Sequence, residues 1–403
     1  MQKVLIVGGG TGGTMLANTL DKRRFDVTVL SASAQHMFQP GLLYVAFQGA
    51  SGRLLRDERS LLRRHVKWVQ DRAARIDLAR HIVYTESGTQ LEYDAIVLAT
   101  GIVTDPSQVP GLSEINAQFG DYHSTVTQSQ KLWRALNSFS GGTIALGQSS
   151  PVCKCPPSPV EGILLAEEFV RKKGLRNKTR LVLFTPYPRA YPAEPMNSVI
   201  EPILKERGIE IFPIFDLDRI DQATRTMFSI EGDQIQYDLP IVIPPFTGAD
   251  IVYEPASVVD ESRLVITDRA SLRVKGVERA FALGDGTNLP TSKAGVGAHL
   301  EAKVIARALN GEPATFDGRT HCPVDLAGGL GTFVIGSYTA RVVPYPPSRI
   351  KHWMKKMMAH IYWLSLRGTL EPFFEWYFAW TAPEKLAQRL ARHTAGKQFP
   401  VVK

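Results

Sequence analysis

A glycine-rich turn near the start of the chain constrains the fold most strongly. An apolar run at residues 4–7 leads into this turn, and a helical pattern follows at residues 14–20. In the G-x-G-x-x-G spacing the first glycine makes a tight turn, the second admits a pyrophosphate, and the third lets the helix pack on the strand. The sequence therefore predicts an α/β domain that binds a dinucleotide at a helix N-terminus. The residues of the predicted cofactor turn are Gly8, Gly10, Thr11, Gly12 and Gly13.

The second strand, at residues 26–30, lacks the acidic residue that usually follows it. In such domains an Asp or Glu at this point binds the ribose hydroxyl pair. Here the strand is followed by Ser31, Ala32 and Ser33. A serine can still hydrogen-bond a ribose, with less charge assistance. Ser31 and Ser33 are therefore the candidates for the ribose contact, which stays open, and Ser31 and Ala32 are predicted to line the cofactor site.

Two later apolar strands end in glycine. One reaches Thr100-Gly101, and the other, near residue 280, reaches Gly284-Asp285. With the first turn, this pattern is typical of flavoproteins with two dinucleotide-binding domains, in which such an aspartate binds the ribityl chain of FAD. An ordinary acidic turn is the alternative for Asp285. We expect residues 1–110 and 246–320 to form the FAD domain, with a β-hairpin inserted at residues 66–92.

A second Rossmann-like domain is predicted at residues 111–245. Its first strand, at residues 143–147, is followed by Gln-Ser-Ser-Pro and not by Gly-x-x-Gly. Strand and helix patterns then alternate, which predicts a parallel sheet. Because a second pyrophosphate needs small residues at the helix end, a nicotinamide cofactor is not expected here.

Residues 151–161 are rich in proline and carry two of the three cysteines, Cys153 and Cys155. Proline fixes φ and removes an amide donor, so we expect a stiff loop that is neither helix nor interior strand. A free cysteine is often simply a small buried hydrophobe. The proline-rich setting favours a redox role for Cys155 together with the distant Cys322. Cys-x-Cys lacks the paired spacing of zinc sites, so no metal is expected.

The C-terminal region, residues 321–403, has a different character. Apolar residues from Ile350 to Leu364 recur at helical spacing, with basic residues between them, and an aromatic-rich segment follows at residues 372–380. This pattern favours a membrane interface, with a core or dimer face as the alternative. No window of about 18 uninterrupted apolar residues occurs, so no helix should span a bilayer.

Charge, cysteine content and the N-terminal pattern limit the partners and the cellular location that we expect. The net charge is +8, but no long basic run is present, so nucleic acid is not an expected partner. Three cysteines are too few for a secreted disulfide scaffold. The first strand begins without a leader pattern. We therefore expect a peripheral, monotopic protein at the cytoplasmic face of the cell membrane, and a homo-oligomer is left open.

Taken in order, these motifs resemble those of the sulfide:quinone oxidoreductases. The flavoprotein subunit of flavocytochrome c sulfide dehydrogenase has a similar Cys-Pro-Pro segment, whereas type II NADH dehydrogenases share the fold and tail but lack the cysteines. A flavin-binding redox sensor without turnover is a further alternative. The resemblance rests on the turn at residues 8–13, Ala99-Thr100-Gly101, residues 155–161, Gly284-Asp285, residues 292–295, Cys322 and the amphipathic tail.

The resemblance implies a noncovalent FAD, a cysteine pair and a membrane quinone. Cys155 and Cys322 would carry sulfur as a disulfide or polysulfur bridge that hydrosulfide attacks, and Glu161 would accept a proton. Electrons would pass through the flavin to a quinone. Cys153 has no matched role, and His123 stands near the place of a third cysteine found in many members. The implied quinone contacts are Phe374, Tyr362 and Trp363, and Lys293 is implied beside the cofactor.

Overall fold

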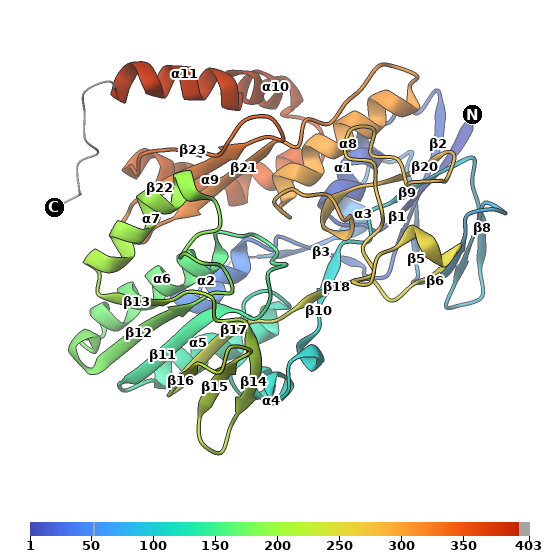
Figure 1. Ribbon diagram of the computed structural model, residues 1–403. Coiled ribbons are helices and arrows are strands. Elements are labelled where there is room, and N and C mark those ends of the chain that lie inside the picture. The colour runs from blue at the N-terminus through green and yellow to red at the C-terminus, as the bar shows by residue number, and fades with distance from the viewer. Residues whose placement is uncertain (51–52, 395–403) are drawn as a thin grey trace.

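A five-stranded parallel sheet contains the predicted cofactor turn. The computed structural model describes residues 1–50 and 53–394. The strand order is β20-β9-β1-β2-β5, so the late strand β20 lies beside β9, as the dinucleotide-binding pattern predicts. Helices α1 and α8 pack against each other on this sheet (Figure 1). The elements are β1 (Gln2–Val7), α1 (Thr11–Thr19), β2 (Phe25–Ser31), β5 (Lys67–Gln70), β9 (Ala95–Leu98), β20 (Ala280–Ala282) and α8 (Gly295–Leu309).

Several short strands and helices belong to the same part of the molecule as this first sheet. Of the hairpin predicted at residues 66–92, only residues 73–92 form antiparallel strands, because β5 belongs to the parallel sheet. Strand β19 pairs in parallel with the outer edge of β6. Strands β3 and β4 form a two-stranded antiparallel ladder, and the short helix α3 contacts β4. These elements are β3 (Gln35–Met37), α2 (Gly41–Gln48), β4 (Leu55–Asp57), α3 (Glu58–Leu61), β6 (Ala73–Asp77), β7 (Ile82–Thr85), β8 (Gln90–Glu92) and β19 (Val252–Glu254).

The chain leaves the first sheet through β10 and returns through β18, and these two strands pair in antiparallel fashion. Between them lies the predicted second parallel sheet, in the order β13-β12-β11-β17. A three-stranded antiparallel sheet, β14-β15-β16, extends away from it (Figure 1). The elements are β10 (Ile102–Thr104), α4 (Leu112–Phe119), α5 (Val126–Ser138), β11 (Gly142–Gln148), α6 (Ser158–Lys172), β12 (Thr179–Phe184), α7 (Glu194–Glu206), β13 (Ile209–Phe212), β14 (Leu217–Asp221), β15 (Thr226–Ser229), β16 (Gln234–Gln236), β17 (Leu239–Ile243) and β18 (Phe246–Gly248).

The prediction that residues 151–161 are loop throughout is wrong at their C-terminal end. Helix α6 begins at Ser158, so the last four residues form its first turn. Pro159 is tolerated there because the first amides of a helix have no intrahelical partner. Glu161 therefore lies on a helix, directly after the cysteine-bearing turn.

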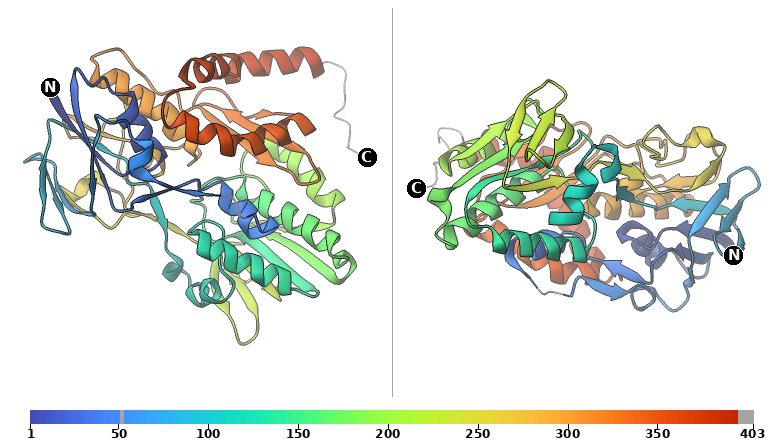
Figure 2. Two further views of the ribbon diagram at one scale, coloured as in Figure 1. Left: turned by 180° about the vertical axis from the view of Figure 1, so that it is seen from behind. Right: turned by 90° about the horizontal axis from the view of Figure 1, so that it is seen from below.

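A third antiparallel sheet, β21-β22-β23, carries Cys322 and supports the C-terminal helices. Helix α9 packs on β21 and β22, and α10 and α11 follow along the same side of the molecule (Figures 1 and 2). Among the described residues, no helix has both the length and the apolar content that crossing a membrane requires. The remaining elements are β21 (Thr320–Asp325), β22 (Gly331–Gly336), β23 (Val343–Pro344), α9 (Arg349–Ser365), α10 (Glu371–Trp380), α11 (Pro383–Thr394) and the 3-10 turns η1 (Pro106–Gln108), η2 (Arg176–Lys178), η3 (Ala256–Val258) and η4 (Gly284–Gly286).

Candidate active site

The glycines of the first turn take three different roles in the structure. Gly8 has a φ of +117°, and a Cβ there would lie 2.2 Å from the Ala99 oxygen. A Cβ at Gly13 would lie 2.0 Å from the Gly8 oxygen, so this glycine lets the helix approach the turn. At Gly10, by contrast, a Cβ would meet nothing within 4 Å. The open space beside Gly10, at the start of α1, is where the fold accommodates a pyrophosphate.

The other two glycine-ended strands meet this turn at the same edge of the sheet. A Cβ at Gly286 would lie 2.8 Å from the Gly101 oxygen and 3.1 Å from Thr100 Oγ1, so the two turns are in contact. Among the described residues, no side chain donates a hydrogen bond to the carboxylate of Asp285. An open cradle and an unpartnered carboxylate at the carboxyl ends of parallel strands fit a bound FAD.

Glu58 lies beside the cofactor turn, near the end of β2, where the strand itself supplies no acidic residue. Ser31 Oγ donates to the Ser33 oxygen at 3.0 Å, and Ala32 is exposed. A Cβ on Gly9 would lie 3.2 Å from the Glu58 carboxyl carbon. Glu58 comes from α3 and is buried, and its carboxylate accepts a hydrogen bond from Thr14. Sequence analysis missed this residue because Glu58 does not follow the strand.

Tyr362 joins α9 to the cofactor turn. Its hydroxyl lies 2.8 Å from Thr11 Oγ1 and 2.5 Å from His36 Nε2. The other ring nitrogen of His36 lies 2.7 Å from Glu58 Oε2, which completes a buried network. The predicted quinone residue Tyr362 thus lies against the nucleotide turn.

Phe374 lies on α10 and packs among other aromatic rings. Its ring packs against His299 and Phe378, at centroid distances of 5.1 and 5.9 Å. Trp363 is buried and packs near Phe38, which Tyr362 also contacts. Among the described residues, neither Tyr362 nor Trp363 makes a ring contact with Phe374.

Two consecutive residues contact the predicted cysteine pair, one residue at each cysteine. The amide of Cys155 donates to the Lys293 oxygen at 3.0 Å, and Ser292 Oγ lies 3.4 Å from Cys322 Sγ. The Lys293 ammonium donates to the backbone oxygens of Asp285 and Thr287, at 2.8 and 2.7 Å. The loop before α8 therefore connects the sulfur atoms to the Gly-Asp turn of the cofactor site.

The turn that carries Cys155 is held in an unusual conformation. Cys155 has a φ of +60°, in the left-handed region that side chains rarely adopt, and its oxygen accepts the Ser158 amide at 2.8 Å. Such backbone strain often occurs at functional sites. Cys153 is buried nearby, and its thiol donates to the Lys154 oxygen at 3.2 Å. All three cysteines are free thiols in the structure.

Glu161 is buried and forms an ion pair. Its Oε1 lies 2.8 Å from Lys355 Nζ, on α9, and accepts the Asp325 amide at 2.6 Å. Burial raises the pKa of Glu161, and the Lys355 ammonium opposes this rise. Burial lowers the pKa of Lys355, but neighbouring negative charge, chiefly Glu161, outweighs burial and leaves that pKa above its ordinary value. Lys355 therefore stays protonated.

His123 packs at the start of α6. Its Nε2 lies 2.8 Å from Ser158 Oγ, and the side chain is buried. Burial lowers the pKa of His123 to about 3, with Lys154 adding to the shift. The imidazole is therefore neutral near neutral pH.

The amphipathic helix α9 turns its apolar face outward. The predicted helical periodicity is confirmed, but Lys355, from between the apolar positions, is buried at 8% exposure. Ile350 and Trp353 are 74% and 67% exposed. Within the described chain, a core-packed apolar face is therefore excluded. The other exposed apolar residues of α9 and α10 are Met354, Met357, Leu364, Phe373, Trp376 and Trp380.

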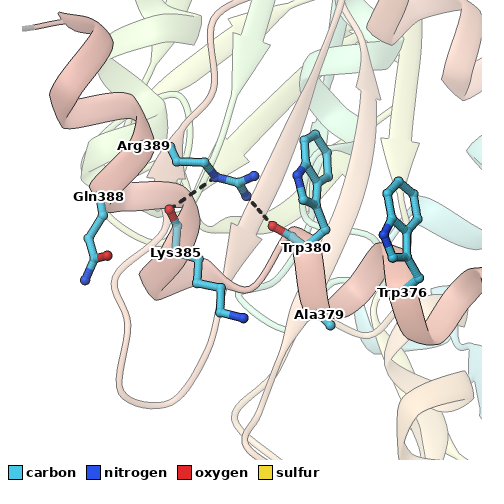
Figure 3. A pocket seen from close by; sticks show the side chains of 6 residues that line it. All are labelled: Trp376, Ala379, Trp380, Lys385, Gln388 and Arg389. Carbon is cyan, nitrogen blue, oxygen red and sulfur yellow. Dashed lines mark hydrogen bonds between the residues drawn. The ribbon is translucent and has the colours of Figure 1, made fainter.

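A hollow of about 440 Å³ lies between α10 and α11 on this outer surface. Trp376 and Trp380 stack nearly parallel along one wall, with centroids 6.1 Å apart (Figure 3). Arg389 lies over the Trp380 ring and donates to the Trp380 and Lys385 backbone oxygens. The outer surface thus combines exposed indole rings with basic side chains.

The dinucleotide turn, the Gly-Asp turn and the adjoining cysteines define a flavoprotein oxidoreductase built on two Rossmann-like sheets. The chain belongs to the pyridine nucleotide-disulphide oxidoreductase family, whose model matches residues 2–302. It is an FAD-dependent oxidoreductase.

Several relatives are named for sulfide and quinone. The mitochondrial sulfide:quinone oxidoreductase of Mus musculus is 28% identical over 396 residues, which cover 91% of this chain and 86% of that protein. The sulfide-quinone reductase of Aquifex aeolicus is 24% identical, over 92% of this chain and 93% of that protein. The X-ray structure of the sulfide:quinone oxidoreductase from Aquifex aeolicus matches with a TM-score of 0.81 at 19% identity, covering 94% of this chain and 95% of that chain. The resemblance predicted from the motifs is confirmed.

Proposed function

We propose that this protein oxidises sulfide through Cys155, Cys322 and FAD, and passes the electrons to a membrane quinone. One observation carries this proposal. Ser292 and Lys293 contact the two cysteines, and Lys293 also binds the backbone of the Gly-Asp turn. Thiol chemistry at the pair is thereby connected to the flavin site. The names of the similar proteins support the same function.

The chain's own residues have distinct parts in the proposed reaction. Bound FAD would supply the two-electron acceptor, held at the open cradle beside Gly10 and by Asp285. Hydrosulfide would add to one sulfur of a Cys155–Cys322 disulfide, and the electron pair of the broken bond would leave on the other sulfur as a thiolate. Glu161 would accept the proton that the new persulfide later releases, because it is the buried carboxylate beside the pair.

A nicotinamide substrate is less well supported by the second sheet. After β11 the chain enters the strained turn at Cys155, and the first turn of α6 carries the buried Glu161. A pyrophosphate at this helix end would meet a carboxylate in place of free amide groups. The type II NADH dehydrogenase alternative predicts that NADH bleaches the flavin, whereas our proposal predicts that sulfide does.

Binding to a membrane surface is part of the proposal, with the cytoplasmic face as the expected side. The outward apolar face of α9 and the indole-rich α10 support it, because rings of this kind favour the headgroup region. Phe374, Tyr362 and Trp363 remain the proposed quinone contacts. Since Tyr362 reaches the cofactor turn, α9 would extend from the lipid surface to the flavin site.

The test is anaerobic stopped-flow absorbance of the flavin, with sulfide as the reductant and a water-soluble quinone as the oxidant. We expect sulfide to bleach the flavin and quinone to restore it over repeated turnovers. Cys155→Ser and Cys322→Ser should each abolish bleaching by sulfide while FAD stays bound. Cys153→Ser is the matched control, and we expect it to retain substantial activity. Full activity in either of the first two variants would refute the cysteine mechanism, and bleaching without turnover would favour a redox sensor.

A further inference from the structure

Lys355 lies at the junction of the two segments that carry the predicted redox cysteines. Its ammonium donates to the Pro323 oxygen at 2.9 Å, and Pro323 directly follows Cys322 on β21. It also pairs at 2.8 Å with Glu161, on the helix that follows Cys155. The side chain reaches this position from α9 and is almost fully buried. One buried cation thus joins both sides of the sulfur site.

We propose that Lys355 is the cation that stabilises the thiolate of the sulfur site, and that with Glu161 it directs the negative charge to Cys322. The thiolate step rests on the proposed function. Hydrosulfide adds to Cys155 Sγ, the S–S bond to Cys322 breaks, and the electron pair leaves on Cys322 Sγ. The proton stays on the new persulfide, so one negative charge enters and one negative charge remains.

The surroundings of Cys322 favour a thiolate more than those of Cys155 do. Cys322 Sγ has two hydroxyl neighbours, Ser292 Oγ at 3.4 Å and Thr320 Oγ1 at 3.6 Å. Burial raises the pKa of Cys322, and these hydroxyls and Lys355 oppose the rise more strongly than Glu161 adds to it. Hydroxyl donors and a cation favour a thiolate at Cys322.

At Cys155 the Glu161 carboxylate has a larger effect on the thiol pKa than the Lys355 ammonium, the reverse of Cys322. Burial raises the pKa of Cys155 well above its ordinary value, and the Glu161 carboxylate adds more than the Lys355 ammonium removes. This order agrees with the geometry, because Glu161 follows Cys155 on α6 whereas Lys355 binds the residue after Cys322. The same ion pair therefore disfavours charge on one sulfur and favours it on the other.

Other titratable groups also face the sulfurs. Lys154 influences Cys155 and Cys153, but its ammonium donates to the Gln39 side chain in another segment. The Asp325 carboxylate accepts a hydrogen bond from Tyr44 at 3.0 Å and lies 3.3 Å from His352 Nδ1. The remaining groups that face this cluster are Cys153, Tyr122, Tyr191 and Lys356.

Site-resolved alkylation tests the proposal without sulfide or quinone. The reduced full-length flavoprotein is treated with iodoacetamide between about pH 6 and 10, and mass spectrometry follows each cysteine separately. The main variant is Lys355→Met with Glu161→Gln, because removing both charges leaves neither one buried and unpaired. Lys355→Arg retains the cation. Lys351→Met is the matched control on α9, where the lysine donates to the Pro346 oxygen and faces Tyr345.

We expect the double variant to slow alkylation of Cys322 and speed that of Cys155. A shift of one pKa unit at either sulfur changes its thiolate fraction about tenfold, so their ratio should fall by about tenfold or more. Lys355→Arg and Lys351→Met should keep the wild-type ratio. A shift of both cysteines in the same direction, or an unchanged ratio, would overturn the proposal. If the wild-type protein does not oxidise sulfide while the ratio change is intact, the result would count against the proposed function alone.

Discussion

Replacing Ile350 and Trp353 together with asparagine should detach the protein from lipid without unfolding it. Both side chains lie on the outward face of α9 and are 74% and 67% exposed. Neither belongs to the buried core, so the folded state loses little packing when they are shortened. The contact that they lose is the one proposed with the membrane surface.

The size of the effect follows from the exposed fractions. Full burial of a large apolar side chain stabilises by roughly 1.5–3 kcal/mol. Burying the exposed part of these two side chains in the lipid interface therefore contributes about 3 kcal/mol in total. Since about 1.4 kcal/mol corresponds to a tenfold change, vesicle binding should weaken by about a hundredfold.

The assay is co-sedimentation with vesicles of phosphatidylcholine and phosphatidylglycerol over a range of lipid concentrations. Ile230→Asn is the matched control, because Ile230 is 67% exposed in the turn between β15 and β16, at the far end of the molecule from α10 and α11 (Figure 1). The control should bind vesicles as the wild type does. Unchanged binding of the double variant, with an unchanged thermal midpoint, would refute the assignment of α9 to the lipid surface.

Three further predictions concern the cofactor site. Gly10→Val should fold but lose FAD, because a Cβ there meets no protein atom and fills only the cradle; undiminished FAD absorbance would contradict this. Tyr362→Phe should lower the free energy of unfolding by about 1–3 kcal/mol, because it leaves Thr11 and His36 without their shared hydroxyl; an unchanged urea midpoint would count against it. Burial raises the pKa of Glu301 from 4.5 to about 7, so the folded state holds a proton that the unfolded state releases. Stability should therefore fall as pH rises through this window, by about 3 kcal/mol. Glu301→Gln should remove that fall in the thermal midpoint, and a persisting slope would point to another group.

Structural features that depend on only a few consecutive residues could be predicted from the sequence. The turn beginning at Gly8 requires positive φ and close packing on a neighbouring strand, which only glycine allows, so its composition reveals its role. The parallel order of the second sheet followed from alternating strand and helix patterns. The error at residues 158–161 arose because proline was treated as excluding a helix, although the first turn tolerates it.

Long-range contacts could not be predicted in the same way. Glu58 reaches the corner beside Gly9 from a short helix, and Tyr362 reaches the cofactor turn from α9. Neither residue follows the strand that it serves, and no local pattern marks it. In the same way, no local pattern marks His299, from α8, as the side chain that packs against Phe374.

The sequence by itself determined that the chain forms a dinucleotide-binding α/β fold, carries a cysteine-bearing turn after β11, and has an amphipathic helix from Ile350 to Leu364. Each conclusion depends on φ restrictions or periodicity within a short segment. Only the tertiary structure decided which face of α9 points outward. Lys355 turns inward because Glu161, distant in the sequence, and the Pro323 oxygen offer a buried ammonium the partners that it requires. Ile350 and Trp353 are left on the surface as a consequence.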